Sequence, residues 1–388
     1  GLLGLFYFYL LSLGLFKSEN NLFKNFAYIR FIFLALSIMI FVNSENNKKI
    51  IYYFLLLLLN FVSLDAIYQS VSGINFLGFE NSIERRLTGV FDDEEVLGSF
   101  LSKSFLICAI LFCLIKKNNS EKLLFYFSSI IIVTATYISA ERLAIFAITI
   151  FMGVFFILQF KKLIHRFYFV ILSILILIFV INTFEKVKIN VLAKTLAQIG
   201  LNEISYLLIE NSQSFKDWSI EISKIDENKN KKLTINNENF LYDKFGLKKS
   251  NKNIYSAHYI TAKKIWLDNF WFGAGVKSFI ENCKKEKYEL PDHPYNKSRC
   301  STHPHNIYLQ ILSEIGILGF IFFILILYYL FIKNINNLFG SNKNILSLLG
   351  FIIIFLPLPS GNFFGTWYGS ILWIFLGLNF KEFLLKKS

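Results

Sequence analysis

An imidazole and an amide, His305 and Asn306, stand at the start of a long apolar segment and are the residues of this chain best suited to chemistry. Nine residues separate them from the pair Gly316-x-x-Gly319, and the segment stays apolar to about residue 332. An imidazole exchanges protons near neutral pH. At the end of a membrane span it meets water, lipid headgroups and membrane-bound substrates, so we expect the reactive site there.

Arginines form the second set of candidates. Arg85 and Arg86 precede Gly89 and an acidic cluster, and Arg142 follows Glu141 in a short turn between two apolar segments. A guanidinium holds phosphate oxygens through two parallel hydrogen bonds. Each position also has a structural explanation, because an arginine beside a span often extends to the membrane interface.

The composition is that of a membrane protein. Apolar residues make up 54% of the 388 and aromatic residues 18%, and the mean hydropathy is +0.49. A helix needs about 20 apolar residues to cross the hydrocarbon of a bilayer. We therefore predict an all-α polytopic protein with about ten spans, at residues 1–16, 25–42, 50–65, 97–115, 123–139, 142–160, 167–182, 306–332, 345–358 and 367–380.

Lysine clusters orient these spans. They mark alternate short connections, which the positive-inside rule places in the cytoplasm: Lys48-Lys49, Lys116-Lys117, Lys161-Lys162, Lys333 with Lys343, and Lys386-Lys387. The opposite face then receives 66–96, the turn near 140, 183–304 and 359–366. The predicted domains are 1–182 (N-terminal helices), 183–304 (a large external loop of short helices, with helical patterning at 190–210 and 256–270) and 305–388 (C-terminal helices).

The net charge of +13 follows from this topology and from attraction to anionic lipids. Basic residues do not interleave with aromatic ones in a stripe, so we expect membrane lipids and no nucleic acid as partners.

If the His305 segment is one regular helix, its faces differ. At 100° per residue, Gly316 and Gly319 fall within about 40° of His305, where small residues let a neighbouring backbone approach. Glu314 is deep enough that it should face the bundle interior or a wet cavity. A polar stripe on a second side is formed by Asn306, Gln310 and Glu314.

Cysteine and histidine spacing gives no metal motif. Neither CxxC nor HExxH occurs, and His293, His303 and His305 lack a partner set with metal-ligand spacing. We expect no metal and no cofactor. Cys283 and Cys300 share the external loop, where an oxidising compartment would let them pair, but the sequence does not give their separation.

Together these motifs resemble the O-antigen ligase and polymerase superfamily of bacterial membrane glycosyltransferases. His305-Asn306 followed by Gly316-x-x-Gly319 is similar to its signature, as are the flanking Tyr308 and Glu314. Arg86-x-x-Gly89-x-Phe91 and the Arg142 turn resemble its two upstream arginine motifs. Trp266, Asn269, Gly273-x-Gly275 and Phe279 resemble its segment late in the loop, although the proline often found before that glycine pair and the arginine often found upstream of the tryptophan are missing.

The resemblance implies a GT-C-like fold in the bacterial inner membrane, with the active site facing the periplasm. It implies transfer of a glycan from undecaprenyl diphosphate to lipid A–core (ligase) or to another lipid-linked glycan (polymerase), without a metal and with inversion at the anomeric carbon. His305, Arg86 and Arg142 would be catalytic and Gly316 and Gly319 structural. The substrate-binding residues would be Arg85, Asn306, His303, Tyr308 and Glu314.

Two other classes stay open. A transporter of lipid-linked glycans would also be polytopic, but it would more often place charges at the bilayer midplane in two similar halves. A membrane sensor with an external domain would need no reactive imidazole. The ligase is preferred to the polymerase because the spacing from the histidine to the glycines resembles the ligase pattern.

Overall fold

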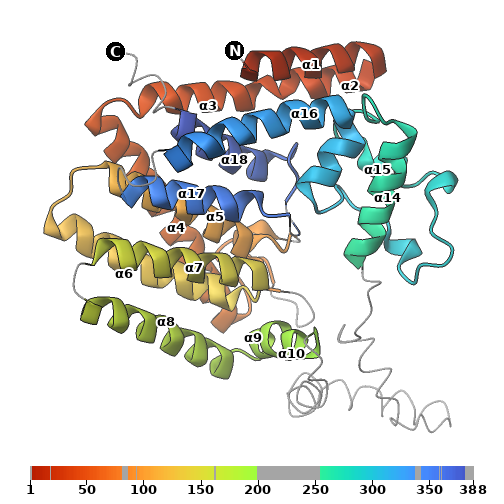
Figure 1. The fold of residues 1–388 in the computed structure, drawn as a ribbon. Helices are drawn as coiled ribbons and strands as arrows, with labels where there is room; N and C mark the ends of the chain where they lie inside the picture. Colours follow the sequence, from red (N-terminus) through yellow and green to blue (C-terminus); the bar gives the residue numbers. More distant parts are fainter. Residues whose placement is uncertain are drawn as a thin grey trace, which may run out of the picture. The chain divides into compact units, whose positions relative to one another are not determined.

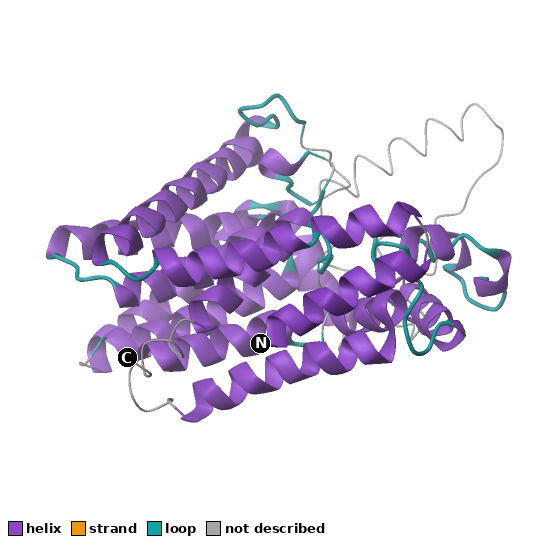
Figure 2. Cartoon of the chain, turned by 90° about the horizontal axis from the view of Figure 1, so that it is seen from above, coloured by secondary structure: helices purple, strands orange, loops and turns teal. Residues whose placement is uncertain are grey.

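The structure is a computed structural model that describes residues 2–17, 19–80, 86–92, 94–160, 163–198, 254–336, 342–357, 359 and 361–380. Within these residues the fold is helical, with one isolated β-bridge between Ile74 and Glu80 and no strands. Figure 2 shows these helices and the loops that join them. The predicted all-α class is confirmed for this part of the chain.

The chain divides into two compact units. Unit 1 comprises Gly1–Ile50, Cys113–Ile115 and Ser250–Ser388, and unit 2 comprises Ile51–Phe112 and Lys116–Lys249.

Unit 1 contains α1 to α3 and the helices from α14 onward (Figure 1). Helix α18 packs on α3 through small residues, since a Cβ at Gly377 would lie 2.7 Å from the Ala35 carbonyl oxygen. The Trp373 indole N–H donates to the Tyr28 hydroxyl at 2.9 Å. The helices are α1 (Leu2–Lys17), α2 (Glu19–Ala27), α3 (Ile29–Phe41), α14 (Ile254–Asp268), α15 (Phe279–Asn282), α16 (Ile307–Asn336), α17 (Asn342–Phe355) and α18 (Thr366–Phe380), with 3-10 turns η3 (Glu286–Tyr288) and η4 (Asn296–Ser298).

Unit 2 is built around a cluster of aromatic rings. Phe112 and Phe125 stack with centroids 4.0 Å apart, and Phe125 also contacts Phe155 at 5.3 Å. The elements are α4 (Glu45–Ser72, in this unit from Ile51), η1 (Gly89–Phe91), α5 (Leu97–Leu114), α6 (Asn119–Ile138), α7 (Arg142–Gln159), α8 (Leu163–Thr183), α9 (Glu185–Val187), η2 (Lys188–Ala193, π-helical) and α10 (Lys194–Gln198).

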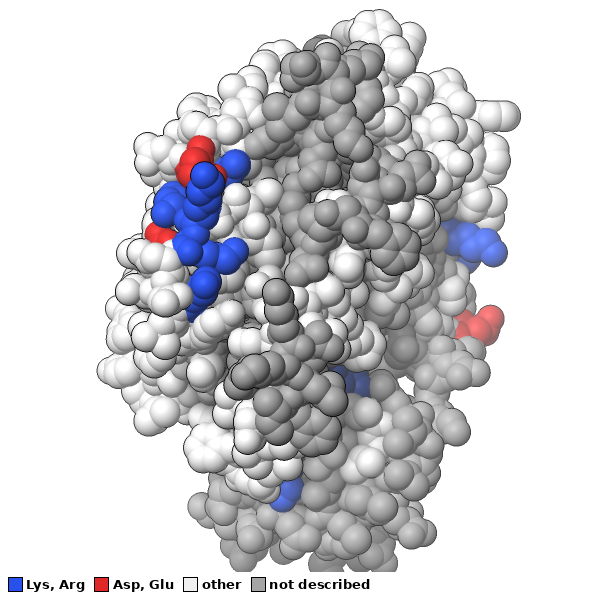
Figure 3. Space-filling model, turned by 60° about the vertical axis from the view of Figure 1, so that its left-hand side comes forward, with Lys and Arg blue, Asp and Glu red and all other residues white. Residues whose placement is uncertain are grey.

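Helices occur at the positions of the predicted spans, but fewer meet the criteria for crossing a bilayer. Six helical segments of the described chain are long and apolar enough: Phe23–Phe41, Glu45–Ser72, Leu97–Leu114, Asn119–Ile138, Arg142–Gln159 and Ile307–Ile332. Helical segments at four other predicted spans are shorter or less apolar: Leu2–Phe16, Ile171–Thr183, Asn344–Phe355 and α18. On the face shown in Figure 3, most of the described surface carries neither basic nor acidic residues, as expected for a multi-pass membrane protein.

Helix α16 is not regular, and the predicted face shared by His305, Gly316 and Gly319 is wrong. His305 precedes the helix and has a positive φ of 55°, and Gly316 breaks the helix with φ 72° and ψ −175°. Residues on either side of such a break do not follow one 100° rotation, so Gly316 and Gly319 do not share a helical face with His305. A Cβ at Gly319 would first meet the side chain of Ile315, at 2.5 Å.

The segment 183–304, predicted to be an external loop, is helical at the predicted positions where the structure describes it. Helix α14 matches the patterning at 256–270, and the segment predicted at 190–210 is helical to Gln198, beyond which it lies outside the described residues. Cys283 and Cys300 form a disulfide with their Cα atoms 5.4 Å apart. Cys283 packs with Ile265, Phe279 and Tyr288 in a small core, so the pair joins this part of the loop to α14.

Candidate active site

The turn before α16 presents His305 to its surroundings. His305, with a φ of 55°, makes a sharp turn in the backbone. Asn306 then caps the helix, because its side-chain oxygen accepts hydrogen bonds from the backbone N–H groups of Tyr308, at 3.0 Å, and Leu309, at 3.1 Å. Asparagine is among the best residues for capping a helix N-terminus in this way. The amide predicted to bind substrate therefore also holds the turn that carries the imidazole.

His305 lies among aromatic rings. The centroids of His303, His258 and Tyr255 are 4.2, 5.2 and 5.5 Å from its own, and its Nε2 is 3.0 Å from the Ser301 hydroxyl. Burial lowers the pKa of His305 to about 3, and the nearby His303 and His258 add to this effect. The imidazole is therefore neutral near pH 7 and has one nitrogen that can accept a hydrogen bond.

His258 was missed by the sequence analysis. It lies on α14, is buried, and its Nδ1 is 3.0 Å from the Arg299 carbonyl oxygen. Burial lowers its pKa as well. No spacing rule relates a histidine on α14 to one that follows it by 47 positions (305 − 258), so only the folded chain shows that their rings are adjacent.

The break in α16 is occupied by the loop after α14. A Cβ at Gly316 would lie 2.3 Å from the Trp271 carbonyl oxygen, and one at Gly273 would lie 2.3 Å from the Glu314 carbonyl carbon. These are backbone atoms, which cannot move aside as a flexible side chain does. The two glycines therefore allow two stretches of backbone to meet, which explains the Gly273-x-Gly275 part of the motif.

Backbone groups freed by the break find partners in that loop. The Ala274 and Gly275 N–H groups donate to the Ser313 and Glu314 carbonyls, each at 2.8 Å, and the Ile317 N–H donates to the Phe270 carbonyl at 2.9 Å. The Tyr9 hydroxyl of α1 donates to the Ile315 carbonyl at 2.6 Å. Unpaired backbone groups are costly in a membrane, so these contacts make the broken helix stable.

Glu314 is fully buried inside unit 1, as its depth predicted. Its carboxylate accepts the backbone N–H of Lys277 at 2.8 Å and that of Phe279, at the start of α15, at 3.4 Å. Gln310, on the predicted polar stripe, contacts the Asn362 side chain at 2.7 Å and the Phe363 N–H at 2.9 Å. The Tyr308 hydroxyl donates to the Phe355 carbonyl. These polar groups tie α16 to the segments around it.

Unit 2 carries the arginine motifs. Gly89, with φ 56°, is held by a buried network in which its N–H donates to Gln69 and its carbonyl accepts from Asn75, both at 2.8 Å. Arg86 precedes this fixed turn and pairs with Glu95 at 3.5 Å. Arg85 lies outside the described residues.

Arg142 is the first residue of α7, next to a well-anchored carboxylate. Glu141 accepts the Ser99 backbone N–H at 2.7 Å and the Ser99 hydroxyl, and Ala140 makes the turn with φ 58°. The predicted turn between spans is confirmed, and it fixes the start of α7.

A third cation, Lys194 of α10, accompanies these arginines and was also missed. Its ammonium donates to the Asn190 side chain at 2.7 Å. Burial and, after it, the positive charges of Arg86 and Arg142 lower the pKa of Lys194 to about 8, while the negative charge of Glu95 acts in the opposite direction. Unit 2 therefore gathers three basic groups, an arrangement that suits a polyanionic ligand.

The described residues hold no group of three or more His, Cys, Asp and Glu side chains placed to bind a metal ion. Among the candidate residues, unit 1 supplies a neutral imidazole at His305 and unit 2 supplies the clustered basic groups Arg86, Arg142 and Lys194.

The six candidate spans of the described part define a multi-pass membrane protein, and this protein carries a desolvated histidine and clustered basic groups. Residues 127–324, a little over half of the chain, match the O-antigen ligase family, and the chain belongs to this family. The match includes Arg142, Lys194 and His305, whereas Arg86 precedes it. The comparison with curated proteins found no match. The chain is a membrane enzyme of the O-antigen ligase and polymerase type.

Proposed function

We propose that this enzyme transfers a glycan from undecaprenyl diphosphate to an acceptor hydroxyl at the periplasmic face of the inner membrane, and that it is a ligase whose acceptor is lipid A–core. The observation that carries the proposal is the neutral, desolvated His305 at the start of α16, within the family match.

His305 orients the acceptor hydroxyl and takes its proton. The hydroxyl oxygen attacks the anomeric carbon, the bond from that carbon to the diphosphate oxygen breaks, and the electron pair leaves with the diphosphate. Attack from the face opposite the leaving group inverts the anomeric configuration. A group with a pKa near 3 is a weak base in the free protein. The negative charge of a bound diphosphate would raise the pKa of His305, since an opposite charge favours the protonated form.

Arg86, Arg142 and Lys194 bind the diphosphate and stabilise the charge that develops on it. Bidentate guanidinium contacts and an ammonium supply positive charge of the kind that a divalent metal often supplies to a phosphate. Binding an anion also relieves the repulsion that lowers the pKa of Lys194. We therefore propose transfer without a metal, with Arg85 as an additional contact.

The remaining candidates support the imidazole. His303 and Asn306 shape the turn, and Tyr308, Glu314, Gly316 and Gly319 belong to the broken helix that begins next to it. We propose that His303, Asn306 and Tyr308 also contact the acceptor, and that Glu314 acts by holding Lys277 and Phe279.

The disulfide supports the proposed periplasmic location of the active site. Disulfides persist in oxidising compartments such as the periplasm and are rare in the cytosol, and Cys283–Cys300 lies in the loop that precedes His305. The lysine clusters independently favour the same orientation. We retain 1–182, 183–304 and 305–388 as functional domains within this proposal.

Replacing His305 tests the reaction. Purified His305→Ala protein, given lipid-linked glycan and lipid A–core in the presence of EDTA, should lose glycan transfer, whereas His293→Ala should keep it. His293 is a buried histidine of the same unit, bonded to Ser256 at 3.0 Å. Transfer by the His305 variant at the wild-type rate refutes the assignment, and loss of wild-type transfer in EDTA refutes metal independence.

Gene deletion in the host separates the ligase from its alternatives. A ligase mutant should leave bare lipopolysaccharide core and long polymer on the lipid carrier. Core capped by single repeats would identify a polymerase, which the family match equally allows. Glycan accumulating on the cytoplasmic side of the membrane would instead identify a transporter.

A further inference from the structure

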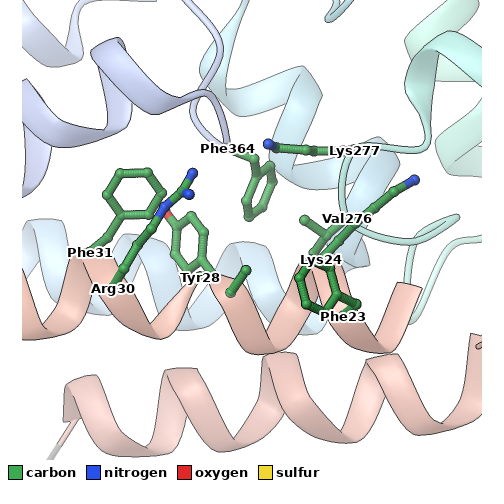
Figure 4. A pocket seen from close by; sticks show the side chains of 9 residues that line it. Phe23, Lys24, Tyr28, Arg30, Phe31, Val276, Lys277 and Phe364 are labelled. Atoms are coloured by element: carbon green, nitrogen blue, oxygen red, sulfur yellow. The ribbon is translucent and has the colours of Figure 1, made fainter. Parts of the chain in front are cut away.

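Unit 1 contains a pocket that the proposed reaction does not use. It has a volume of about 160 Å³, room for several water molecules at about 30 Å³ each. Its walls come from three parts of the chain: Phe23–Phe31 of α2 and α3, Val276 and Lys277 after α14, and Phe364 before α18. Figure 4 shows these side chains around the pocket.

Three cations line this pocket: Lys24, Arg30 and Lys277. Lys24 pairs with the exposed Glu281 at 3.2 Å. The Arg30 guanidinium donates to the Thr366 hydroxyl at 3.3 Å and lies 4.8 Å from the centre of the Phe31 ring. In Figure 4 the charged end of Lys277 lies just above Phe364 and that of Arg30 lies to the left of Phe364, whereas that of Lys24 points away from them.

The cations repel one another. The pKa of Lys277 is lowered by burial first and then by the positive charges of Arg30 and Lys24, with Glu314 opposing. Both carboxylate oxygens of Glu314 accept backbone N–H groups. Like charges gathered in a partly buried pocket favour an anion, because it removes the repulsion between them.

The rest of the pocket is apolar. Tyr28, Phe31 and Phe364 are at most 3% exposed and form its floor, while Phe23 is 76% exposed at its edge. Both Phe23 and Lys24 lie at the start of the candidate span Phe23–Phe41. Basic and exposed aromatic side chains at the end of a span are typical of the membrane interface, where lipid headgroups meet acyl chains.

We propose that this pocket binds the phosphate group of an anionic membrane lipid, with Arg30 and Lys277 on the phosphate and Phe23 against the hydrocarbon chain. Lys24 stays paired with Glu281 and adds longer-range attraction. A lipid fits better than free phosphate, because free phosphate would leave the exposed apolar edge uncovered.

Lipid retention by the full-length protein tests this. Purified protein in neutral detergent would receive palmitoyl-oleoyl-phosphatidylglycerol, and native mass spectrometry would measure the bound lipid. Each basic residue near an anionic lipid surface adds about fivefold to affinity, so Arg30→Gln/Lys277→Gln should weaken binding about 25-fold. The matched control is Lys263→Gln/Lys284→Gln, which removes two exposed charges from the same unit and should bind as the wild type does.

Thermal unfolding in the same detergent checks that both double variants are folded. Equal retention by the wild type and the Arg30/Lys277 variant refutes the site, as does an equal loss in the Lys263/Lys284 control. Displacement of the lipid by an equal concentration of inorganic phosphate refutes the assignment to a lipid. If the Arg30/Lys277 variant does not fold, Phe23→Ser replaces it: Phe23 is exposed, and the variant should still weaken lipid binding.

Discussion

Gly316→Ala tests whether the break in α16 is obligatory. At φ 72° and ψ −175° the backbone is in a region essentially confined to glycine, and forcing another residue into it costs about 1–3 kcal/mol. The new methyl group would lie 2.3 Å from the Trp271 carbonyl oxygen and 2.5 Å from two backbone nitrogens, and such overpacking costs about 1–3 kcal/mol more. We expect a loss of about 2–6 kcal/mol of unfolding free energy.

The measurement is thermal unfolding of the purified protein in detergent, followed by tryptophan fluorescence. Gly153→Ala on α7 is the control, because a methyl group there meets nothing within 4 Å and alanine favours a helix over glycine by about 0.5–1 kcal/mol. The unfolding midpoint should fall for the first variant and stay or rise for the second.

A milder variant covers the case in which Gly316→Ala does not fold. Tyr9→Phe removes the hydroxyl that donates to the Ile315 carbonyl, and leaving a buried acceptor unpaired costs about 1–3 kcal/mol. If Gly316→Ala unfolds at the wild-type midpoint, the break is not required and our account of the α16–loop contact is wrong.

Three further outcomes follow. Replacing Cys283 and Cys300 by alanine should lower the unfolding free energy by about 3 kcal/mol because the bridge closes a loop of 17 positions; reductant should destabilise the wild type but leave the double variant unchanged. Lys194, with a pKa near 8, loses its charge as the pH rises from about 7 to about 9, so affinity for lipid diphosphate should fall over that range and Lys194→Arg should flatten the fall; identical profiles would exclude Lys194 from the site. The folded-state pKa of His305 lies below its unfolded value, so its contribution to stability is complete above about pH 6.5 and is lost as the pH falls toward 3. Between pH 7 and pH 5 the wild type should therefore lose up to about 2 kcal/mol more than His305→Gln, and an equal loss in both would show that His305 is not desolvated.

The sequence predicted the features that depend on local pattern. Apolar runs located the helices, and the resemblance around His305 identified the family that the match at 127–324 shows. Charge and spacing singled out Arg86, Arg142 and His305, whose joint action stays a prediction. The number of spans was less predictable, because the apolar run 345–358 is short and the helix there, Asn342–Phe355, has only 14 residues.

The sequence did not reveal what depends on tertiary contact. His258 lies next to His305, and Lys194 interacts electrostatically with Arg86 and Arg142, although these residues are far apart in the sequence. Neither His258 nor Lys194 lies in a recognisable motif. The break at Gly316 was missed because a glycine inside an apolar run is compatible with a straight helix. It becomes a break only when the loop at Gly273 supplies the hydrogen bonds that the helix gives up.

The interlock between Gly273 and Gly316 also bears on how the protein is made. In the folded protein the backbone groups at the break between residues 307–315 and 317–336 bond to Phe270–Gly275 and to Tyr9, so the broken form would leave these groups unpaired before those partners are present. An unpaired group in hydrocarbon costs several kcal/mol. During biogenesis, this span therefore reaches its final form only after α1 and the loop after α14 are in place, so the turn that carries His305 is completed at a late step of assembly.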